Sequence, residues 1–293
     1  MSRTPRPLTA VIPATPASRA ADRPEPRSGP LRLPASRRAW SEWPFVVPFA
    51  GRVLALQGMH PVVSAGMMDH SSVFRDPWGR GWDTIGYGLR LVFSDDPLAV
   101  AGEIRELHRP LHGRLADGTR YHPWNPGPWA WVHLSTFEAT VYARRAIGRA
   151  PTPAEQAELY EEWKRVGRGY GLREQDLPAD VAALNRYVWS TIQDELVATP
   201  TATRLYHDTL RSPPAPPGLP GAQLAWPLAG RLAGPSIRLL LAGSFPSVLR
   251  RRMSIPWTPL HEAGYQAALL ALRAAVHTLP AALTRFPIAR AAA

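Results

Sequence analysis

One stretch of the chain holds the side chains whose types and spacing best suit chemistry. Arg80 and Thr84 are four residues apart, and His108 stands three residues after Arg105 and four before His112. Separations of three and four place side chains on one face of a helix. An imidazole that can bind a metal, beside guanidinium groups that can pair with carboxylates, is the donor set that a non-covalent haem site needs. The chain has no cysteine, which excludes thiolate ligation and covalent haem attachment through C-x-x-C-H.

Two simpler interpretations compete for His108. A single histidine on an apolar helical stripe is more often a hydrogen-bonded core residue than a metal ligand. His108 and His112 also form H-x-x-x-H, the spacing of zinc ligands on a helix. The zinc hydrolase pattern requires glutamate directly after the first histidine, where this chain has Arg109, and Pro110 distorts the intervening turn. The zinc interpretation is therefore the weaker of the two.

Length and composition fit a globular protein with a sizeable core. The chain has 293 residues, of which 45% are hydrophobic and 19% charged. No run of about 18 uninterrupted apolar residues occurs, so no transmembrane helix is predicted. The N-terminal segment is rich in arginine and proline and lacks the apolar region of a secretory signal. We therefore expect a cytoplasmic protein.

The net charge of +11 belongs to the two ends of the chain. Residues 1–40 hold eight arginines against two acidic residues, and residues 221–293 hold eight arginines against one. Residues 41–220 have 18 basic and 20 acidic side chains, so this part carries −2. The positive charge is thus not concentrated around the candidate site residues, which argues against a nucleic-acid enzyme. The basic ends of the chain are compatible with a peripheral membrane contact.

The residue pattern predicts an all-α fold with one main core. Residues 1–39 contain eight prolines and no periodic pattern of apolar residues. They are therefore expected to form a disordered basic tail. Residues 40–280 are expected to form the helical domain, with a proline-rich linker at 212–220 inside it, and residues 281–293 a flexible C-terminus. Helices are expected near 53–68 (broken at Pro61), 77–93, 97–111, 129–147, 153–167, 179–198, 222–233, 235–243 and 257–279.

Local signals support several of these boundaries. Ser94-Asp95-Asp96-Pro97 is typical of a helix N-cap with proline in the first turn, which explains the two aspartates better than an aspartate-rich isoprenoid motif. Thr152 and Glu155 form a capping box. Pro110 should kink the end of the 97–111 helix beside His108. Asp117-Gly118 favours a small hairpin.

The remaining histidines of the central region have separate expectations. His60 lies in an apolar run beside Pro61, so it should be buried and either hydrogen-bonded or facing a cavity. His133 follows two apolar residues in a helix and should make a structural hydrogen bond. His122 lies in a turn-rich segment and should be exposed.

An ordered set of short motifs resembles a known family. Its members, the MpaB-type oxygenases and the rubber oxygenases (latex clearing proteins), are similar to this chain over about residues 45 to 275. The motifs are Gln57-x-x-His60-Pro61, Asp76-Pro77, Arg80-x-x-x-Thr84, Arg105-x-x-His108, Asp117-Gly118-x-x-Tyr121, Trp131-x-His133 and Glu162-Trp163-x-Arg165-x-Gly167.

The resemblance implies an all-helical, globin-like fold with haem b bound through the histidine that matches His108. It also implies that Arg80 and Thr84 belong to the haem-site signature. The implied activity is the use of dioxygen to oxidise or cleave a hydrophobic substrate, with isoprenoids as one candidate. We expect Arg80, Thr84, Arg105 and His112 to contact the haem, and His60, Arg80 and Thr84 to act in catalysis, with His60 as a distal-side or pocket residue.

Three departures from the rubber oxygenase pattern bear on that activity. His112 stands where an arginine closes the motif around His108, and Asp83 stands where a lysine precedes the threonine. Ser64 occupies the region in which those enzymes carry a catalytic glutamate, and no glutamate occurs between Gln57 and Asp69. Cleavage of polyisoprene is therefore less supported than haem binding. The alternative is a non-catalytic helical module whose Leu/Arg-rich segment, residues 224–252, binds an apolar ligand or a membrane surface.

Overall fold

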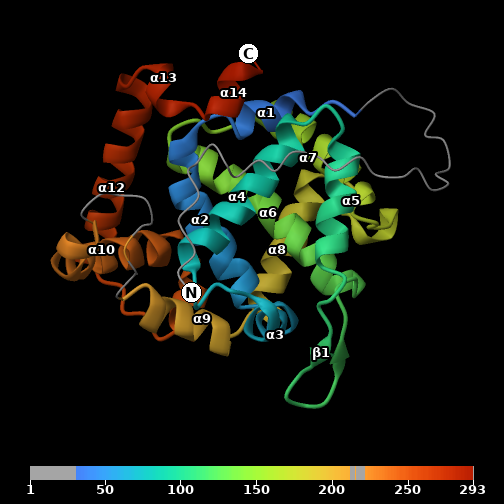
Figure 1. The fold of residues 1–293 in the computed structure, drawn as a ribbon, viewed down its shortest axis with the longest axis horizontal. Coiled ribbons are helices and arrows are strands. Elements are labelled where there is room, and N and C mark those ends of the chain that lie inside the picture. Colours follow the sequence, from blue (N-terminus) through green and yellow to red (C-terminus); the bar gives the residue numbers. More distant parts are fainter. Residues whose placement is uncertain (1–30, 212–214, 216–221, 293) are drawn as a thin grey trace.

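The computed structural model describes residues 31–211, 215 and 222–292. Helices make up almost all of the regular structure, and one main cluster of buried apolar side chains runs through them, with two small satellite clusters (Figure 1). The predicted all-α class with one main core is confirmed. The expected disorder of residues 1–30 and most of the proline-rich linker at 212–220 lie outside the described residues.

The first half of the chain folds into helices interrupted by one small hairpin. In chain order the elements are α1 (Pro34–Ala39), the 3-10 turn η2 (Trp43–Phe45), α2 (Val46–Gly58), α3 (Pro61–His70), α4 (Pro77–Phe93), α5 (Pro97–Leu107), β1 (Gly113–Arg114), β2 (Arg120–Tyr121) and α6 (Pro126–Ala146). The two short strands pair antiparallel around the turn that Asp117-Gly118 predicted, and Gly118 has a φ of +84°.

The regular structure of the second half, in its described part, is entirely helical. Its elements are α7 (Pro153–Gly169), the 3-10 turn η3 (Glu174–Asp176), α8 (Val181–Asp194), α9 (Pro200–Arg204), the π-helical turn η4 (Leu205–Thr209), α10 (Ala222–Ser244), α11 (Ser247–Arg252), α12 (Pro259–Thr278), α13 (Ala281–Thr284) and α14 (Pro287–Ala291).

The helix starts agree with their predicted caps. The Asp96 carboxylate accepts a hydrogen bond from the Ala99 amide at 3.0 Å and opens α5. Thr152 and Glu155 form the predicted capping box at the start of α7. These caps satisfy amide groups that have no partner inside the helix, which is why short polar side chains mark helix starts in a sequence.

Two predicted helix boundaries are wrong. The α5 helix ends at Leu107 and does not run to residue 111, because Pro110 has no amide hydrogen and disfavours helical geometry in the residue before it. The helices expected at 222–233 and 235–243 are one helix, α10, which continues through Pro235. A proline inside a helix removes one backbone hydrogen bond, and here this loss does not end the helix.

The break at His60-Pro61 separates two helices that meet at a sharp angle. The segments Trp43–Gly58 and Pro61–His70 are bent by 103° relative to each other. By length and hydropathy, no single helix in the described ranges could cross a membrane, whereas this bent pair passes the same test when its two parts are taken together.

Helix α6 lies at the centre of the molecule, against α2 on one side and α7 on another (Figure 1). Buried residues occur along its whole length and include Trp131, His133, Leu134 and Phe137. A helix surrounded in this way has no single polar face, so its polar side chains need partners inside the protein.

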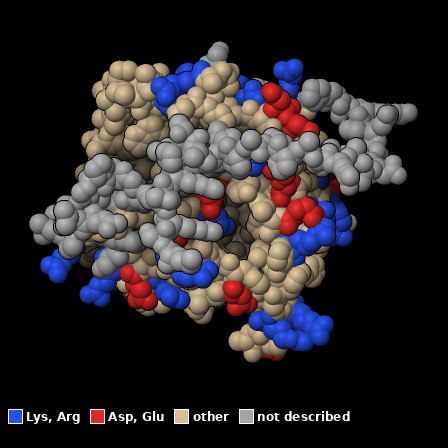
Figure 2. All heavy atoms as spheres, viewed as in Figure 1, with Lys and Arg blue, Asp and Glu red and all other residues tan. Residues whose placement is uncertain are grey.

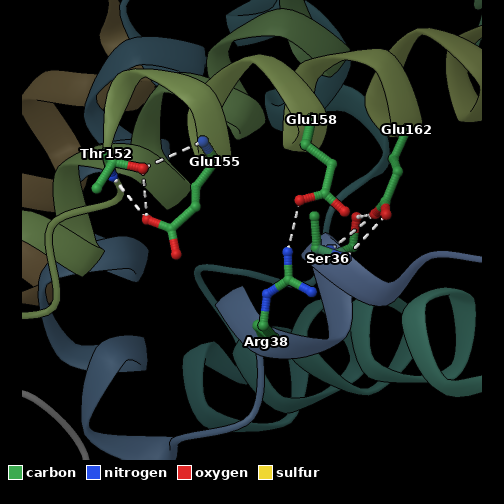
Figure 3. A network of polar contacts seen from close by, with 7 residues as sticks. Ser36, Arg38, Thr152, Glu155, Glu158 and Glu162 are labelled. Carbon is green, nitrogen blue, oxygen red and sulfur yellow. Dashed lines mark hydrogen bonds and ion pairs between the residues drawn. The ribbon is translucent and has the colours of Figure 1, made fainter.

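Ordered structure begins earlier than the sequence indicated, because a buried carboxylate holds α1. The expected tail extended to residue 39, yet Pro34–Ala39 is helical and Ser36 is fully buried. Glu162 of α7 accepts hydrogen bonds from the amides of Ala35 and Ser36 at 2.8 Å each and from the Ser36 hydroxyl at 2.7 Å (Figure 3). Glu162 is only 1% exposed, so this helix start and the carboxylate satisfy each other.

The C-terminal residues are also packed, contrary to the expected flexible end over 281–293. Phe286 is buried, and its amide donates to the Ser41 carbonyl at 3.0 Å. Glu42 and Arg285 form an isolated antiparallel bridge beside it. The end of the chain therefore lies against the segment that follows α1, near the top of Figure 1. Contacts between distant parts of the chain hold both terminal segments, and local sequence signals do not reveal such contacts.

Replacing Glu162 with alanine should destabilise the protein, because it leaves two buried amides and a hydroxyl without their acceptor. We expect the free energy of unfolding to fall by about 3 kcal/mol in urea denaturation. The matched control is Glu158→Ala on the same helix, which removes an ion pair with Arg38 whose side chains are 56% and 48% exposed. Exposed pairs contribute about 0–1 kcal/mol, so equal losses in the two variants would contradict the proposed role of Glu162.

Candidate functional site

His108 occupies the point where α5 ends. It is the C-cap residue of α5, and its Nδ1 atom donates a hydrogen bond of 2.7 Å to the Ile104 carbonyl. A carbonyl oxygen can only accept, so Nδ1 carries the proton and the lone pair of a neutral ring is on Nε2. The imidazole meets the ring of Trp129 edge-on, with 5.1 Å between ring centroids. One ring nitrogen is thus fixed, and the other is left as a donor toward a metal.

Electrostatics keep the His108 ring neutral. Burial lowers its pKa below the ordinary 6.5, the hydrogen bond to Ile104 opposes that shift, and the positive charge of Arg80 adds to it. The influence of Arg80 means that its guanidinium lies near His108, as expected for the antiparallel helices α4 and α5. A metal ligand must be unprotonated, so these surroundings suit a ligand.

Arg80 and Thr84 interact directly on α4. The guanidinium of Arg80 donates to the Thr84 hydroxyl, which in turn donates to the Arg80 carbonyl at 3.0 Å. The shared helix face predicted for these two residues is confirmed. Gly81, Trp82, Asp83 and Thr84 are all exposed, so a complete turn of α4 is not covered by other helices. Figure 2 shows a hollow near the middle of the molecular face in view, with acidic and basic side chains at its border.

Arg105 lies in different surroundings from Arg80 and His108. Its guanidinium stands 4.5 Å from the ring centre of Trp124. Together with Trp124 and Trp129 it lines a cavity of about 270 Å³, and His108 is not in that lining. The structure therefore separates the two arginines that the sequence placed beside His108.

His112 is exposed and lies beyond the end of α5, so it does not share a helix face with His108. Its carbonyl oxygen meets the Nε2 atom of His70 at 3.2 Å. The nearby hairpin is tied to α3 by the Tyr121 hydroxyl, which donates to Asp69 at 2.5 Å. The position that departs from the rubber oxygenase pattern is thus at the base of the hairpin.

His60 is buried, as predicted, at the start of α3. It is 5% exposed, and its Nδ1 atom accepts from the Val63 amide at 3.5 Å. Burial lowers the pKa of His60 to about 4, although Nε2 is 3.6 Å from the Glu195 carboxylate. Glu195 is 58% exposed, so water screens its charge and desolvation of the imidazole dominates.

His60 and His108 contact different sides of α6. The ring of His60 is 6.4 Å from Trp131, whereas His108 contacts Trp129. Residues two positions apart on an α-helix, such as Trp129 and Trp131, are rotated by roughly 200° relative to each other. His60 therefore does not join Arg80 and His108, and its placement gives no support to the expected distal role.

Other residues of the family-like motifs make structural contacts. The Nε2 atom of His133 donates to the Trp163 carbonyl at 2.9 Å, and the Trp163 indole donates to the His133 carbonyl at 3.0 Å. Gln57 donates to the Val132 carbonyl at 3.1 Å. Ser64, in the region of the missing glutamate, is buried and donates to the Thr201 hydroxyl at 2.9 Å.

Sequence reasoning missed two tryptophans that contact the candidate residues. Trp129 packs against His108, and Trp124 packs against Arg105. The indole of Trp129 donates to the Tyr170 carbonyl at 3.1 Å, and this fixes the ring that His108 contacts. Both tryptophans lie in the turn-rich segment before and at the start of α6. Two large aromatic residues among prolines and glycines were the available signal, because such rings are rarely left unpacked.

The Leu/Arg-rich segment of the alternative interpretation ends in three consecutive arginines, Arg250 to Arg252, and the fold uses most of them. Arg252 donates to the carbonyls of Ile192 and Leu196 at the end of α8, at 2.5 and 2.6 Å. Arg250 donates to the Phe245 carbonyl at 2.7 Å and stands over the Trp257 ring. Two of the three guanidiniums are thus held by helix ends, which weakens the hypothesis of a basic membrane-binding segment.

Comparison with known families gives one match. A family model described as "ER-bound oxygenase mpaB/B'/Rubber oxygenase, catalytic domain" matches residues 37–274. The matched range includes every candidate residue considered above. Comparisons with curated proteins and with solved structures give no match.

The buried histidines make stability depend on pH. Burial lowers the pKa of His133 from 6.5 to about 4. As the pH falls from about 6.5 to about 4, the unfolded chain binds a proton that the folded protein does not, so the free energy of unfolding decreases. The slope from one such group approaches 1.4 kcal/mol per pH unit.

We expect His133→Gln to lose stability less steeply than the wild type over this range, by about 1 kcal/mol per pH unit in urea denaturation. The glutamine amide does not titrate and can still donate to the Trp163 carbonyl. Equal slopes for the two proteins would contradict a neutral buried His133. The wild type and the variant should differ little in slope above pH 7, where neither state takes up this proton.

Proposed function

The chain belongs to the family of mpaB and rubber oxygenase catalytic domains, and from this premise we propose that it is a haem b-dependent oxygenase that acts on a hydrophobic substrate with dioxygen. Membership of an oxygenase family supports oxidative chemistry. Protein side chains alone do not activate dioxygen, so the proposal includes a cofactor. Haem b bound through a histidine supplies an iron at which dioxygen can react.

The observation that carries the haem part of the proposal is the state of His108. Its Nδ1–H donates to the Ile104 carbonyl, and its pKa is lowered, so the ring presents an unprotonated Nε2 atom. A haem-ligating histidine needs this combination of a neutral ring and a hydrogen bond from the other nitrogen, which fixes the ring orientation and increases its basicity. The donor chemistry of the residues present therefore fits the group.

Arg80 is the residue that would pair with a haem propionate. Its positive charge acts on His108, and it is partly buried, where a carboxylate partner would offset the cost of desolvation. Thr84 accepts from the same guanidinium and would hold it in position. In this proposal Arg105 is not a propionate partner, because it lines a separate cavity, and exposed His112 does not contact the cofactor.

The uncovered turn of α4 is where a substrate would approach. Trp82 is 40% exposed on this turn and offers an apolar surface. A hydrophobic substrate, with isoprenoids as one candidate class, would gain most from such a surface because burial of apolar area drives its binding. Asp83 replaces a lysine at this point, so the substrate-facing charge differs from that of rubber oxygenases.

Protein expressed with ample haem should show a Soret absorption band, and His108→Ala should abolish it, because the variant lacks the ligand nitrogen. Added imidazole should restore part of the band by occupying the space that the side chain leaves. The measurement is the absorbance ratio of the Soret band to the protein band, with circular dichroism to establish that the variant remains helical.

The control is His122→Ala, which removes an exposed histidine and should keep the band. Arg80→Gln should retain haem with about tenfold lower affinity, because a charge-assisted pair is lost. A wild-type protein without a Soret band, or a band that persists unchanged in His108→Ala, would overturn the proposal.

A further inference from the structure

Arg105 is a half-buried cation without an anion among the described residues. Among the residues that the structure describes, no carboxylate or carbonyl pairs with it, and its Nε atom is buried without a hydrogen-bond partner. Its one close contact of note is the face of the Trp124 ring, 4.5 Å away. A buried donor is ordinarily hydrogen-bonded, because removing a polar group from water without a partner is costly. The described residues therefore leave part of the donor capacity of this guanidinium unused.

A second donor lies beside the first and is also unsatisfied. The indole Nε1 atom of Trp124 is buried with no hydrogen-bond partner in the described chain. Native proteins leave few buried donors unpaired, so two in one place need an explanation. Both belong to side chains that line the same cavity of about 270 Å³. An anion inside that cavity would meet the positive charge of Arg105 beside the Trp124 ring.

The backbone at Gly171 approaches the Arg105 side chain closely. Gly171 has a φ of +84°, which favours glycine, and a Cβ atom there would lie 3.2 Å from the Arg105 Nε atom. Arg173, the other cation of the lining, is already paired with Asp176, with contacts of 2.8 and 2.9 Å. This pairing also neutralises the carboxylate of the lining, so Arg105 is the cation left for a ligand.

The other walls of the cavity are aromatic or apolar. They include Trp129, Tyr170, Pro126 and Leu172. A phosphate or sulfate ion would satisfy the donors but leave these walls without contact. A ligand with one anionic end and an apolar body would use both. The volume lies just below the range of about 300–1,000 Å³ typical of small-molecule sites, which limits the body to one ring or a short chain.

We propose that this cavity is a binding site for a small organic carboxylate, with the carboxylate on the Arg105 guanidinium beside Trp124 and an apolar body between Trp129 and Tyr170. Guanidinium and carboxylate match in geometry, and the pair is strong where water is excluded. The site lies across the Trp129 ring from His108, since that ring contacts His108 at 5.1 Å and Tyr170 at 6.0 Å between centroids. The inference does not depend on haem binding.

The test is a titration of the full-length protein with sodium benzoate, followed by the indole N–H resonances in ¹H–¹⁵N spectra. The Trp124 resonance, assigned from Trp124→Phe, should shift with saturation at millimolar benzoate or below. Benzamide, which has the same shape and no charge, should bind at least about tenfold more weakly. Arg105→Gln should also lose at least about tenfold in affinity, whereas Arg109→Gln, at an exposed ion pair nearby, should bind like the wild type.

Several outcomes would overturn the proposal. These are no saturable shift in the wild type, equal binding of benzamide, or unchanged binding by Arg105→Gln. If Arg105→Gln does not fold, Arg105→Lys keeps the charge without the planar fork and should bind more weakly than wild type yet respond to benzoate. The titration is repeated on haem-loaded protein. Retained binding supports a separate site, and displacement by haem would assign Arg105 to a propionate and contradict the proposal.

Discussion

The burial of helix α6 on several sides is the constraint on which the rest of the structure depends. The buried polar side chains of a helix in this position cannot reach water, so they need partners inside the protein. His133 and Trp163 meet this need reciprocally, since each ring nitrogen donates to the other residue's carbonyl and the rings stack at 5.3 Å. Gln57 supplies the matching contact from α2. These bonds fix α6 relative to α2 and α7 in both position and rotation.

The rotation of α6 decides which histidine can take part in chemistry. With His133 directed at α7, Trp131 faces His60 and Trp129 faces His108. Burial lowers the pKa of both histidines and keeps their rings neutral, but their Nε2 atoms have different surroundings. His60 accepts from a helix-start amide and approaches Glu195 with Nε2, whereas the single hydrogen bond of His108 leaves Nε2 available. The same residue type is thus structural on one side of α6 and suited to ligation on the other.

Much of the fold could be predicted because its signals are local. Caps such as Asp96 and Thr152 fix helix starts through amides two or three residues away, and Asp117-Gly118 fixes the hairpin through one glycine conformation. The terminal helices escaped prediction because their stability comes from Glu162, more than 120 residues away from α1, and from Ser41 against Phe286. The helix face predicted for His108 and His112 does not form, because Pro110 ends α5 at Leu107 and does not merely kink it.

The candidate site could be predicted only in part, because all arginines look alike in a sequence. The guanidiniums of Arg252 and Arg37 donate to backbone carbonyls. Arg37 donates to those of Val92 and Ser94 at 3.1 Å each. A planar fork with five donors suits several carbonyls at a helix end, which gives a chain with one lysine and 33 arginines many structural uses for the residue. What distinguishes a guanidinium with another purpose is therefore its lack of protein acceptors. The spacing from His108 predicts that Arg105 shares the metal site. Its surroundings, a guanidinium without an acceptor in the described part of the protein beside aromatic walls, fit the separate ligand proposed above.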